Sequence, residues 1–178
     1  MKHYLLPLVA VIFSIFLTSC GEDNSILGLG DVQKSDLTTP LFLAADNTLG
    51  DDTKEIWAFN DTEAVKGTIT VVGDNTLRFH SDWFFNTWSY SNKTLTLGQD
   101  QNRQTYNLKK VSVLGYNAIV FAEGTKIYYT CIPSSNWSLN GKHVEDDWYS
   151  RGLTKEKFWN AFRESNTDKK SVEVPLNN

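Results

Sequence analysis

Residues that bind metals or carry thiol chemistry are scarce in this chain. Its 178 residues include two cysteines and three histidines, and these do not lie at the short spacings of a zinc site. Nucleophile-elbow and phosphate-loop motifs are also absent. The net charge is −4 and there is no basic run, which argues against nucleic acid and against peripheral binding to anionic lipid. We therefore expect no cofactor, no metal site and no nucleic-acid partner.

Long apolar runs are missing except for one at the start, "LLPLVAVIFSIFL", which follows a short basic head that contains Lys2. This run has roughly 13 residues, whereas a membrane-spanning helix needs about 20. A basic head, an apolar run of this length and small residues after it are typical of a secretory signal peptide. We therefore expect residues 1–19 to be removed.

The end of this run, "LTSC" (17–20), resembles the bacterial lipobox. The resemblance implies a lipid anchor on Cys20, whose acyl chains supply about 0.8 kcal/mol of membrane affinity per buried CH₂; the alternative is an ordinary signal peptide that happens to contain a cysteine. Gly21 stands where an aspartate retains some lipoproteins in the inner membrane, so we predict the outer membrane of a Gram-negative bacterium. Glu22 and Asp23 resemble an acidic export signal or a polar tether, which leaves periplasmic and surface display open.

Residues 20–54 are rich in Asp, Gly, Thr and Ser and show no sustained hydrophobic period. This composition predicts a polar tether between the lipid anchor and the domain. Its one apolar island, "TPLFLAA" (39–45), can pack on the domain as a short strand or a turn of helix.

From residue 55 to residue 133 the chain consists of short β-branched and aromatic runs separated by turn formers. Such short connections force neighbouring strands to run antiparallel. Apolar residues two apart, such as Leu77 and Phe79, predict one buried face and one wet face, and Cys131 falls on a buried face as a small hydrophobe. The predicted strands are 55–60, 66–72, 76–80, 85–91, 93–98, 103–109, 110–114, 117–122 and 126–132.

Residues 134–178 differ from the strand region. A polar loop is followed by "TKEKFWNAFRES" (154–165), which predicts a helix with Thr154 as its N-cap and with Phe158, Ala161 and Phe162 on one face. A helix this short is marginal alone, so its aromatic face must dock on the sheet. We expect a flexible tail from Asn166, in which "SVEVPL" can add an edge strand.

The block "DNTLRFHSDWFFNTWSYSNKTLTLGQDQNRQTYNLKKVSVLGYNAIVF" resembles the lipocalin-like domain of many small Gram-negative lipoproteins. The family's usual Gly-x-Trp is missing, with Trp57 as a stand-in. The resemblance implies a mostly β fold: an antiparallel up-and-down meander that closes into a lipocalin-like β-barrel, with one C-terminal α-helix packed against it. The residues that carry the resemblance are Trp88, Tyr90, Asn92, Leu95, Leu97, Tyr106, Leu108, Ile119 and Phe121.

The chain has more aromatic side chains than the predicted alternation can bury. Trp83, Phe84 and Phe85 are consecutive and cannot all point inward from one strand, and Trp137 lies in the polar loop. We therefore take these four residues as candidates for ligand binding, because exposed aromatic rings stack on sugars or anchor protein contacts.

Three functions remain open from the sequence. The first is a non-enzymatic binding or interaction lipoprotein whose ligand is a small apolar molecule, a glycan or a protein. The second is a structural or inhibitory, immunity-type envelope lipoprotein with a filled barrel. The third is an envelope hydrolase, which requires two facing carboxylates that nothing in the sequence brings together. "HVEDD" (143–147) can be a cation site or merely an acidic loop, since no calcium-loop pattern is present.

Overall fold

A computed structural model describes residues 30–38, 42–44, 52–113, 116–133, 138–139 and 142–177. The predicted signal peptide, Cys20 and Trp137 lie outside the described residues. In chain order the elements are α2 (Lys34–Thr38), β1 (Phe42–Ala44), β2 (Thr53–Phe59), β3 (Ala64–Val72), β4 (Thr76–Phe85), β5 (Trp88–Ser91), β6 (Thr94–Leu97), the 3₁₀ turn η2 (Asp100–Asn102), β7 (Gln104–Val113), β8 (Tyr116–Glu123), β9 (Lys126–Pro133), β10 (Ser138–Leu139), β11 (Lys142–His143), α3 (Val144–Ser150), α4 (Lys155–Asp168) and β12 (Val172–Pro175).

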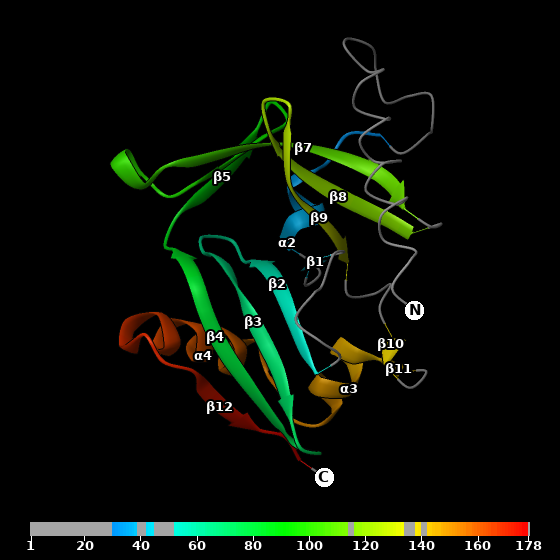
Figure 1. The fold of residues 1–178 in the computed structure, drawn as a ribbon, viewed down its shortest axis with the longest axis vertical. Helices are drawn as coiled ribbons and strands as arrows, with labels where there is room; N and C mark the ends of the chain where they lie inside the picture. Colours follow the sequence, from blue (N-terminus) through cyan, green and yellow to red (C-terminus); the bar gives the residue numbers. More distant parts are fainter. Residues whose placement is uncertain are drawn as a thin grey trace.

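The prediction of a mostly β, antiparallel fold with a C-terminal helix is confirmed. Within the described residues, a ten-stranded antiparallel sheet has the order β12-β4-β3-β2-β1-β9-β8-β7-β6-β5, and β10 pairs with β11 in a separate hairpin. Figure 1 shows the sheet bending at β1, so that β2, β3, β4 and β12 form one wall and β5 to β9 form the other.

The predicted closure of the barrel is not confirmed. Strands β4 and β5 are separated by two residues of chain, yet no pairing among the described residues joins them. Strand β12 pairs with this edge of β4 over Thr76–Phe79, and the indole of Trp88 at the start of β5 donates a hydrogen bond to the Asn60 carbonyl oxygen at 2.7 Å. The sheet therefore stays open between β4 and β5.

Several strand boundaries differ from the predictions. Strand β7 runs unbroken through Lys109 and Lys110, where two strands were predicted, and β4 continues past His80 to Phe85. The Lys110 ammonium lies 2.8 Å from the Asp36 carboxylate, so the charge at that predicted boundary is paired beside the strand. Two consecutive lysines therefore do not end a strand when their side chains have charged partners or contact solvent.

Part of the predicted tether belongs to the fold. Val32 and Leu37 are buried, and β1 pairs with both β9 and β2 near the middle of the sheet. The apolar island at residues 39–45 thus supplies a strand, as one of its two predicted alternatives required. The domain begins well before residue 55.

Buried side chains of the described residues form two clusters, one on each face of the β2–β4 wall. We call them the helix-side cluster, which lies under α3 and α4, and the inner cluster, which lies on the concave face between the two walls. Strand β2 shows both: Ile56 and Ala58 join the helix-side cluster, whereas Trp57 and Phe59 join the inner cluster. Its four consecutive buried residues follow because successive side chains of a strand point to opposite faces. The other members of the inner cluster are Val32, Leu37, Ala64, Phe85, Trp88, Leu95, Leu97, Tyr106, Leu108, Ile119, Phe121 and Cys131, so Cys131 is buried as predicted.

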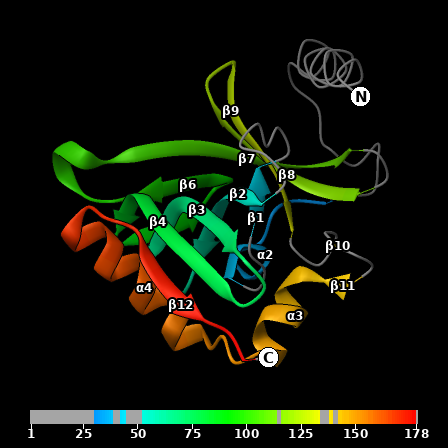
Figure 2. The ribbon, with the colours of Figure 1, turned by 60° about the horizontal axis from the view of Figure 1, so that its bottom comes forward.

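Helix α4 covers the outer face of the β2–β4 wall (Figure 2). Thr154 is its N-cap, as predicted, and accepts a hydrogen bond from the Lys157 amide at 3.1 Å. Phe158, Ala161 and Phe162 are buried against the sheet. The predicted flexible tail is wrong from Asn166, because α4 continues to Asp168. The edge strand predicted within "SVEVPL" is confirmed as β12, which pairs with β4 at the edge of the sheet. Helix α3 is a further correction, since a loop was predicted there.

One ion pair ties α4 to the turn between β2 and β3. The Arg163 guanidinium donates to both carboxylate oxygens of Glu63, at 2.8 and 2.6 Å. These hydrogen bonds lower the pKa of Glu63 below its ordinary value of 4.5, although burial opposes the shift. A lowered folded-state pKa means that the pair stabilises the fold above about pH 4.5 and that this contribution disappears as the pH falls further.

We expect Glu63→Gln to lower the free energy of unfolding at pH 7 by about 0.5–1 kcal/mol, because Arg163 is exposed and the pair is screened by solvent. The difference from wild type should shrink as the pH is lowered below 4. Urea denaturation at pH 7 and pH 3.5 measures both values. An undiminished difference at pH 3.5 would show that the effect does not come from the carboxylate charge.

Candidate functional site

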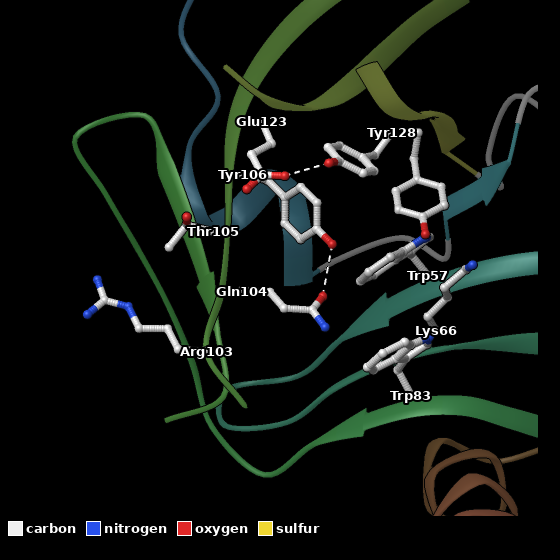
Figure 3. Close-up of a pocket in the computed structure, with 10 residues that line it drawn as sticks. Trp57, Lys66, Trp83, Arg103, Gln104, Thr105, Tyr106, Glu123 and Tyr128 are labelled. Carbon is white, nitrogen blue, oxygen red and sulfur yellow. Dashed lines mark hydrogen bonds between the residues drawn. The ribbon is translucent and has the colours of Figure 1, made fainter. Parts of the chain in front are cut away.

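A cleft lies between the two walls of the sheet. Its volume is about 380 Å³, and strands β2, β3 and β4 supply one side while β7, β8 and β9 supply the other. The side chains in Figure 3 belong to the residues that line it. These are Trp57, Lys66, Trp83, Arg103, Gln104, Thr105, Tyr106, Glu123, Tyr128 and Tyr129.

Trp57, Lys66 and Trp83 form a row across the first wall. Lys66 is the backbone partner of Trp57 on one side and of Trp83 on the other. Because side chains of paired residues lie on the same face of a sheet, the Lys66 side chain follows that of Trp57 and precedes that of Trp83 on this face. Figure 3 shows the three side chains following one another along this side of the cleft. We call them the Trp–Lys–Trp row.

A β-bulge in β4 gives the row its third member. Gly67 pairs with Ser81, but the preceding residue Lys66 pairs with Trp83, so Asp82 is an extra residue in β4. The bulge changes the faces of the residues that follow it. Ser81 is buried toward α4, where its amide donates to the Ser165 hydroxyl at 3.0 Å, while Trp83, two residues later, lines the cleft on the opposite face.

Three tyrosines form the second wall. The ring centroids of Tyr106 and Tyr128 are 5.7 Å apart, and each of these rings lies 6.4 Å from that of Tyr129. The Tyr106 hydroxyl donates to the Gln104 side-chain oxygen at 2.9 Å, and the Tyr128 hydroxyl donates to the Glu123 carboxylate. Burial, followed by the nearby charge of Glu123 and the neighbouring tyrosines, raises the pKa of Tyr106 to about 12. The phenol is therefore neutral at physiological pH.

Lys66 remains charged although its side chain is only 15% exposed. Burial alone would lower its pKa, but a hydrogen bond with Tyr129 and the charge of Glu55, 3.2 Å away, raise it overall. The ammonium nitrogen also lies 4.7 Å from the centroid of the Tyr129 ring, in a cation–π contact.

The polar groups of the cleft carry both signs of charge. Arg103 is exposed, and its guanidinium makes no ion pair with another described residue. Glu123 is a carboxylate whose hydrogen-bond donor is the Tyr128 hydroxyl. The cleft therefore offers aromatic faces together with groups that donate and groups that accept hydrogen bonds.

The four aromatic candidates from the sequence lie in different places. Trp83 lines the cleft and is 51% exposed, and Phe85 is only 7% exposed and stacks against it with centroids 6.4 Å apart. Phe84 points to the other face and packs on Trp159. Trp137 is outside the described residues. The structure thus brings Trp83 and Phe85 together and separates them from Phe84.

Most other cleft residues carry no local signal in the sequence. Alternation places Lys66 with Thr68 and Thr70 on the face of β3 opposite Ile69, which predicts contact with solvent and gives no sign of a cleft. Tyr128 and Tyr129 both line the cleft although they are adjacent, next to a register shift between Phe121 and Ala122 of the neighbouring strand. Irregular pairing between strands creates these positions, and such pairing leaves no local sequence pattern.

Three carboxylates that a hydrolase could use have partners among the described residues. Asp82 lies 3.8 Å from His80, Asp147 lies 3.5 Å from Arg151, and Glu123 accepts from Tyr128. Among the described residues, no group of three His, Cys, Asp or Glu side chains is placed to hold a metal ion. The side chains of His143 and Glu145 lie outside the part of the chain for which side chains are described.

Within the described part of the chain, no helix has both the length and the apolar character needed to cross a membrane. The sequence and the fold were also compared with known proteins. No protein-family model, no curated protein and no solved structure matches this chain significantly.

Proposed function

We propose that this chain is a non-enzymatic binding lipoprotein of the outer membrane, and that the cleft is its binding site. One observation carries the proposal. Among the described residues, the large hydrophobic side chains that are exposed are Trp83 and Tyr128, at 51% and 41%, and both line the cleft. Exposed aromatic rings in a concave site with a few polar groups are typical of ligand binding.

The proposal keeps the three ligand classes expected from the sequence: a small apolar molecule, a glycan or a protein. It also keeps the lipocalin-like relationship as a proposal about fold, with a sheet that is open between β4 and β5. Trp83 and Tyr128 are exposed where they line the cleft, so a ligand reaches it from solvent without passing through the inner cluster.

The structural or inhibitory alternative also has an observation in its favour. Trp57, Leu95, Leu97 and Phe121 are fully buried and fill the space between the two walls below the cleft. A small barrel-like sheet is just wide enough to be filled by its own side chains. In this alternative the cleft receives no small ligand, and the function depends on a protein partner.

Native mass spectrometry of the full-length protein, extracted from its own membranes, separates the two. A non-covalent extra mass that is present in wild type and absent from Trp83→Ala supports the binding proposal. Extraction with no extra mass, together with a protein partner that Trp83→Ala still captures, supports the structural alternative and contradicts ours.

The anchor is tested by Cys20→Ala. We expect this variant to lose the acylated N-terminus and to move from the membrane fraction to the soluble fraction, because the lipid supplies the membrane affinity. Fractionation followed by intact-mass measurement gives the result. Retention of a processed, non-acylated variant in the membrane fraction would contradict the lipoprotein proposal.

A further inference from the structure

We infer that the ligand of the cleft is a carbohydrate, one of whose pyranose rings stacks on Trp83. This inference rests on the proposed function and selects one of its three ligand classes. Its basis is that one small cleft combines exposed aromatic rings with both hydrogen-bond donors and hydrogen-bond acceptors.

The indole of Trp83 is an exposed, flat platform. Its ring lies nearly parallel to that of the buried Phe85, two residues further along β4, with an interplanar angle of 9° and ring centroids 6.4 Å apart. Packing beside this buried ring restricts the indole, so less conformational entropy is lost when a ligand stacks on it. The C–H face of a pyranose is apolar and flat, and it matches such a surface.

The polar groups around this platform match the hydroxyls of a sugar. A hydroxyl both donates and accepts a hydrogen bond. Glu123 offers carboxylate oxygens as acceptors, while the guanidinium of Arg103 offers donors. Gln104 accepts the Tyr106 hydroxyl through its side-chain oxygen, which leaves its amide nitrogen as a further donor. Figure 3 shows Glu123 and Arg103 apart from each other on the side of the cleft that β7 and β8 supply, so hydroxyls at separate positions of a ring can reach them.

A wholly apolar ligand fits these groups poorly. It would cover Arg103, whose guanidinium makes no ion pair with another described residue, without replacing its contacts with water, and burying such a charge is costly. A folded protein also fits poorly, because a stable protein interface needs about 800 Å² of surface from each partner, whereas the exposed large hydrophobic side chains of the described residues are two, Trp83 and Tyr128, both in this cleft of about 380 Å³. That volume lies at the low end of small-molecule sites and suits one or two sugar rings.

The experiment measures binding of the full-length protein to an array of defined mono- to tetrasaccharides, which includes neutral hexosides, N-acetylhexosamines and uronic acids. A fluorescent fatty acid, cis-parinaric acid, serves as the apolar probe. The variants are Trp83→Leu, Trp83→Tyr and Glu123→Gln. Arg78→Gln is the matched control, because Arg78 is exposed on β4 and pairs with Glu173 of β12, away from the cleft.

For the saccharide that binds wild type, we expect Trp83→Leu to weaken binding at least about 10-fold, as for the loss of an anchoring aromatic residue. Trp83→Tyr should retain most of the affinity, since it keeps an aromatic face. Glu123→Gln should weaken binding about 10-fold, because a charged acceptor is replaced by a neutral one. Arg78→Gln should bind as wild type does.

The two variants at Trp83 and the one at Glu123 distinguish stacking of a sugar from burial of an apolar ligand. Equal binding by Trp83→Leu and Trp83→Tyr would overturn the inference, as would tighter binding by Glu123→Gln. Binding of cis-parinaric acid that depends on Trp83, with no saccharide bound, overturns the carbohydrate inference and leaves the proposed function intact. Absence of binding to both probe classes overturns the carbohydrate inference, while the native mass spectrometry decides the proposed function independently.

Discussion

Replacement of Phe162 by alanine is expected to lower the free energy of unfolding by about 3–5 kcal/mol, the usual cost of deleting a fully buried aromatic ring. Phe162 has no exposed surface, and its ring makes edge contacts with Phe79 and Phe158 at centroid distances of 5.2 and 5.1 Å. Because α4 is too short to be stable alone, loss of this contact weakens the helix as well as the sheet beneath it.

Urea or guanidinium denaturation followed by far-UV circular dichroism and tryptophan fluorescence gives the measurement. Glu164→Ala is the control on the same helix, because Glu164 is exposed, and it should stay within about 0.5 kcal/mol of wild type. Separate transitions of the two signals in Phe162→Ala would mean that α4 detaches before the sheet unfolds. A loss of stability below about 1 kcal/mol would contradict the packing described for α4, because relaxation around a deleted core ring only partly offsets its cost.

The helix-side cluster shows how far local patterns predict a contact. The spacing of Phe158, Ala161 and Phe162 predicted both the helix and its buried face, because helical periodicity is a property of neighbouring residues. The place where the helix docks depends on Gly67, which from the sequence alone is only a residue that weakens a strand. A Cβ atom at Gly67 would lie 2.2 Å from the His80 carbonyl oxygen and 2.8 Å from the Phe162 ring. The absence of a side chain at Gly67 therefore leaves the space that the Phe162 ring occupies, and this contact is visible only in the folded structure.

The predicted closure of the sheet is not confirmed, and the sequence could not decide it, because the edges of a sheet are decided by residues far apart in the chain. Strands linked by short turns were recognisable from alternation and turn residues. The partner of β4 at its outer edge, however, is β12, almost a hundred residues later, and the partner of β9 is β1, which the composition placed in a tether. Short segments such as β1 and β12 become strands because they pair with longer neighbours, and their own sequences have little intrinsic preference for the β conformation.

The candidate site was predictable at one residue. Three consecutive aromatic side chains in "DWFF" had to divide between two faces, and this argument identified Trp83. It also included Phe84, because alternation cannot say which face is which until the bulge at Asp82 is known. Lys66, Tyr128 and Glu123 carry no local signal, since their positions follow from pairing registers between strands. Charge in the middle of a strand suggested a wet face, whereas Lys66 lies in the cleft with Glu55 and Tyr129 as partners.

Replacement of Trp57 by alanine is the second large effect that we expect, again about 3–5 kcal/mol of lost stability. Trp57 is 1% exposed and occupies the centre of the inner cluster. Its ring lies 5.4 Å from that of Phe121 and 5.1 Å from that of Tyr129, and it forms part of the cleft wall. The substitution therefore opens a cavity that joins the cleft.

Trp57→Phe tests the physical reason for this loss. The indole nitrogen of Trp57 is buried and has no hydrogen-bond acceptor among the described residues. A buried donor left unsatisfied costs about 1–3 kcal/mol, so removing it offsets most of the lost ring area. We expect Trp57→Phe to stay within about 1 kcal/mol of wild type, while Trp57→Ala does not.

The comparison of the two variants also reports on the ligand. If a bound saccharide accepts a hydrogen bond from the Trp57 indole, Trp57→Phe weakens binding without changing the stability of the unliganded protein. Denaturation in the absence of saccharide and titration with it measure the two effects separately. Equal destabilisation by Trp57→Phe and Trp57→Ala would mean that the indole N–H itself holds the inner cluster together, which is the opposite of what its unsatisfied position implies.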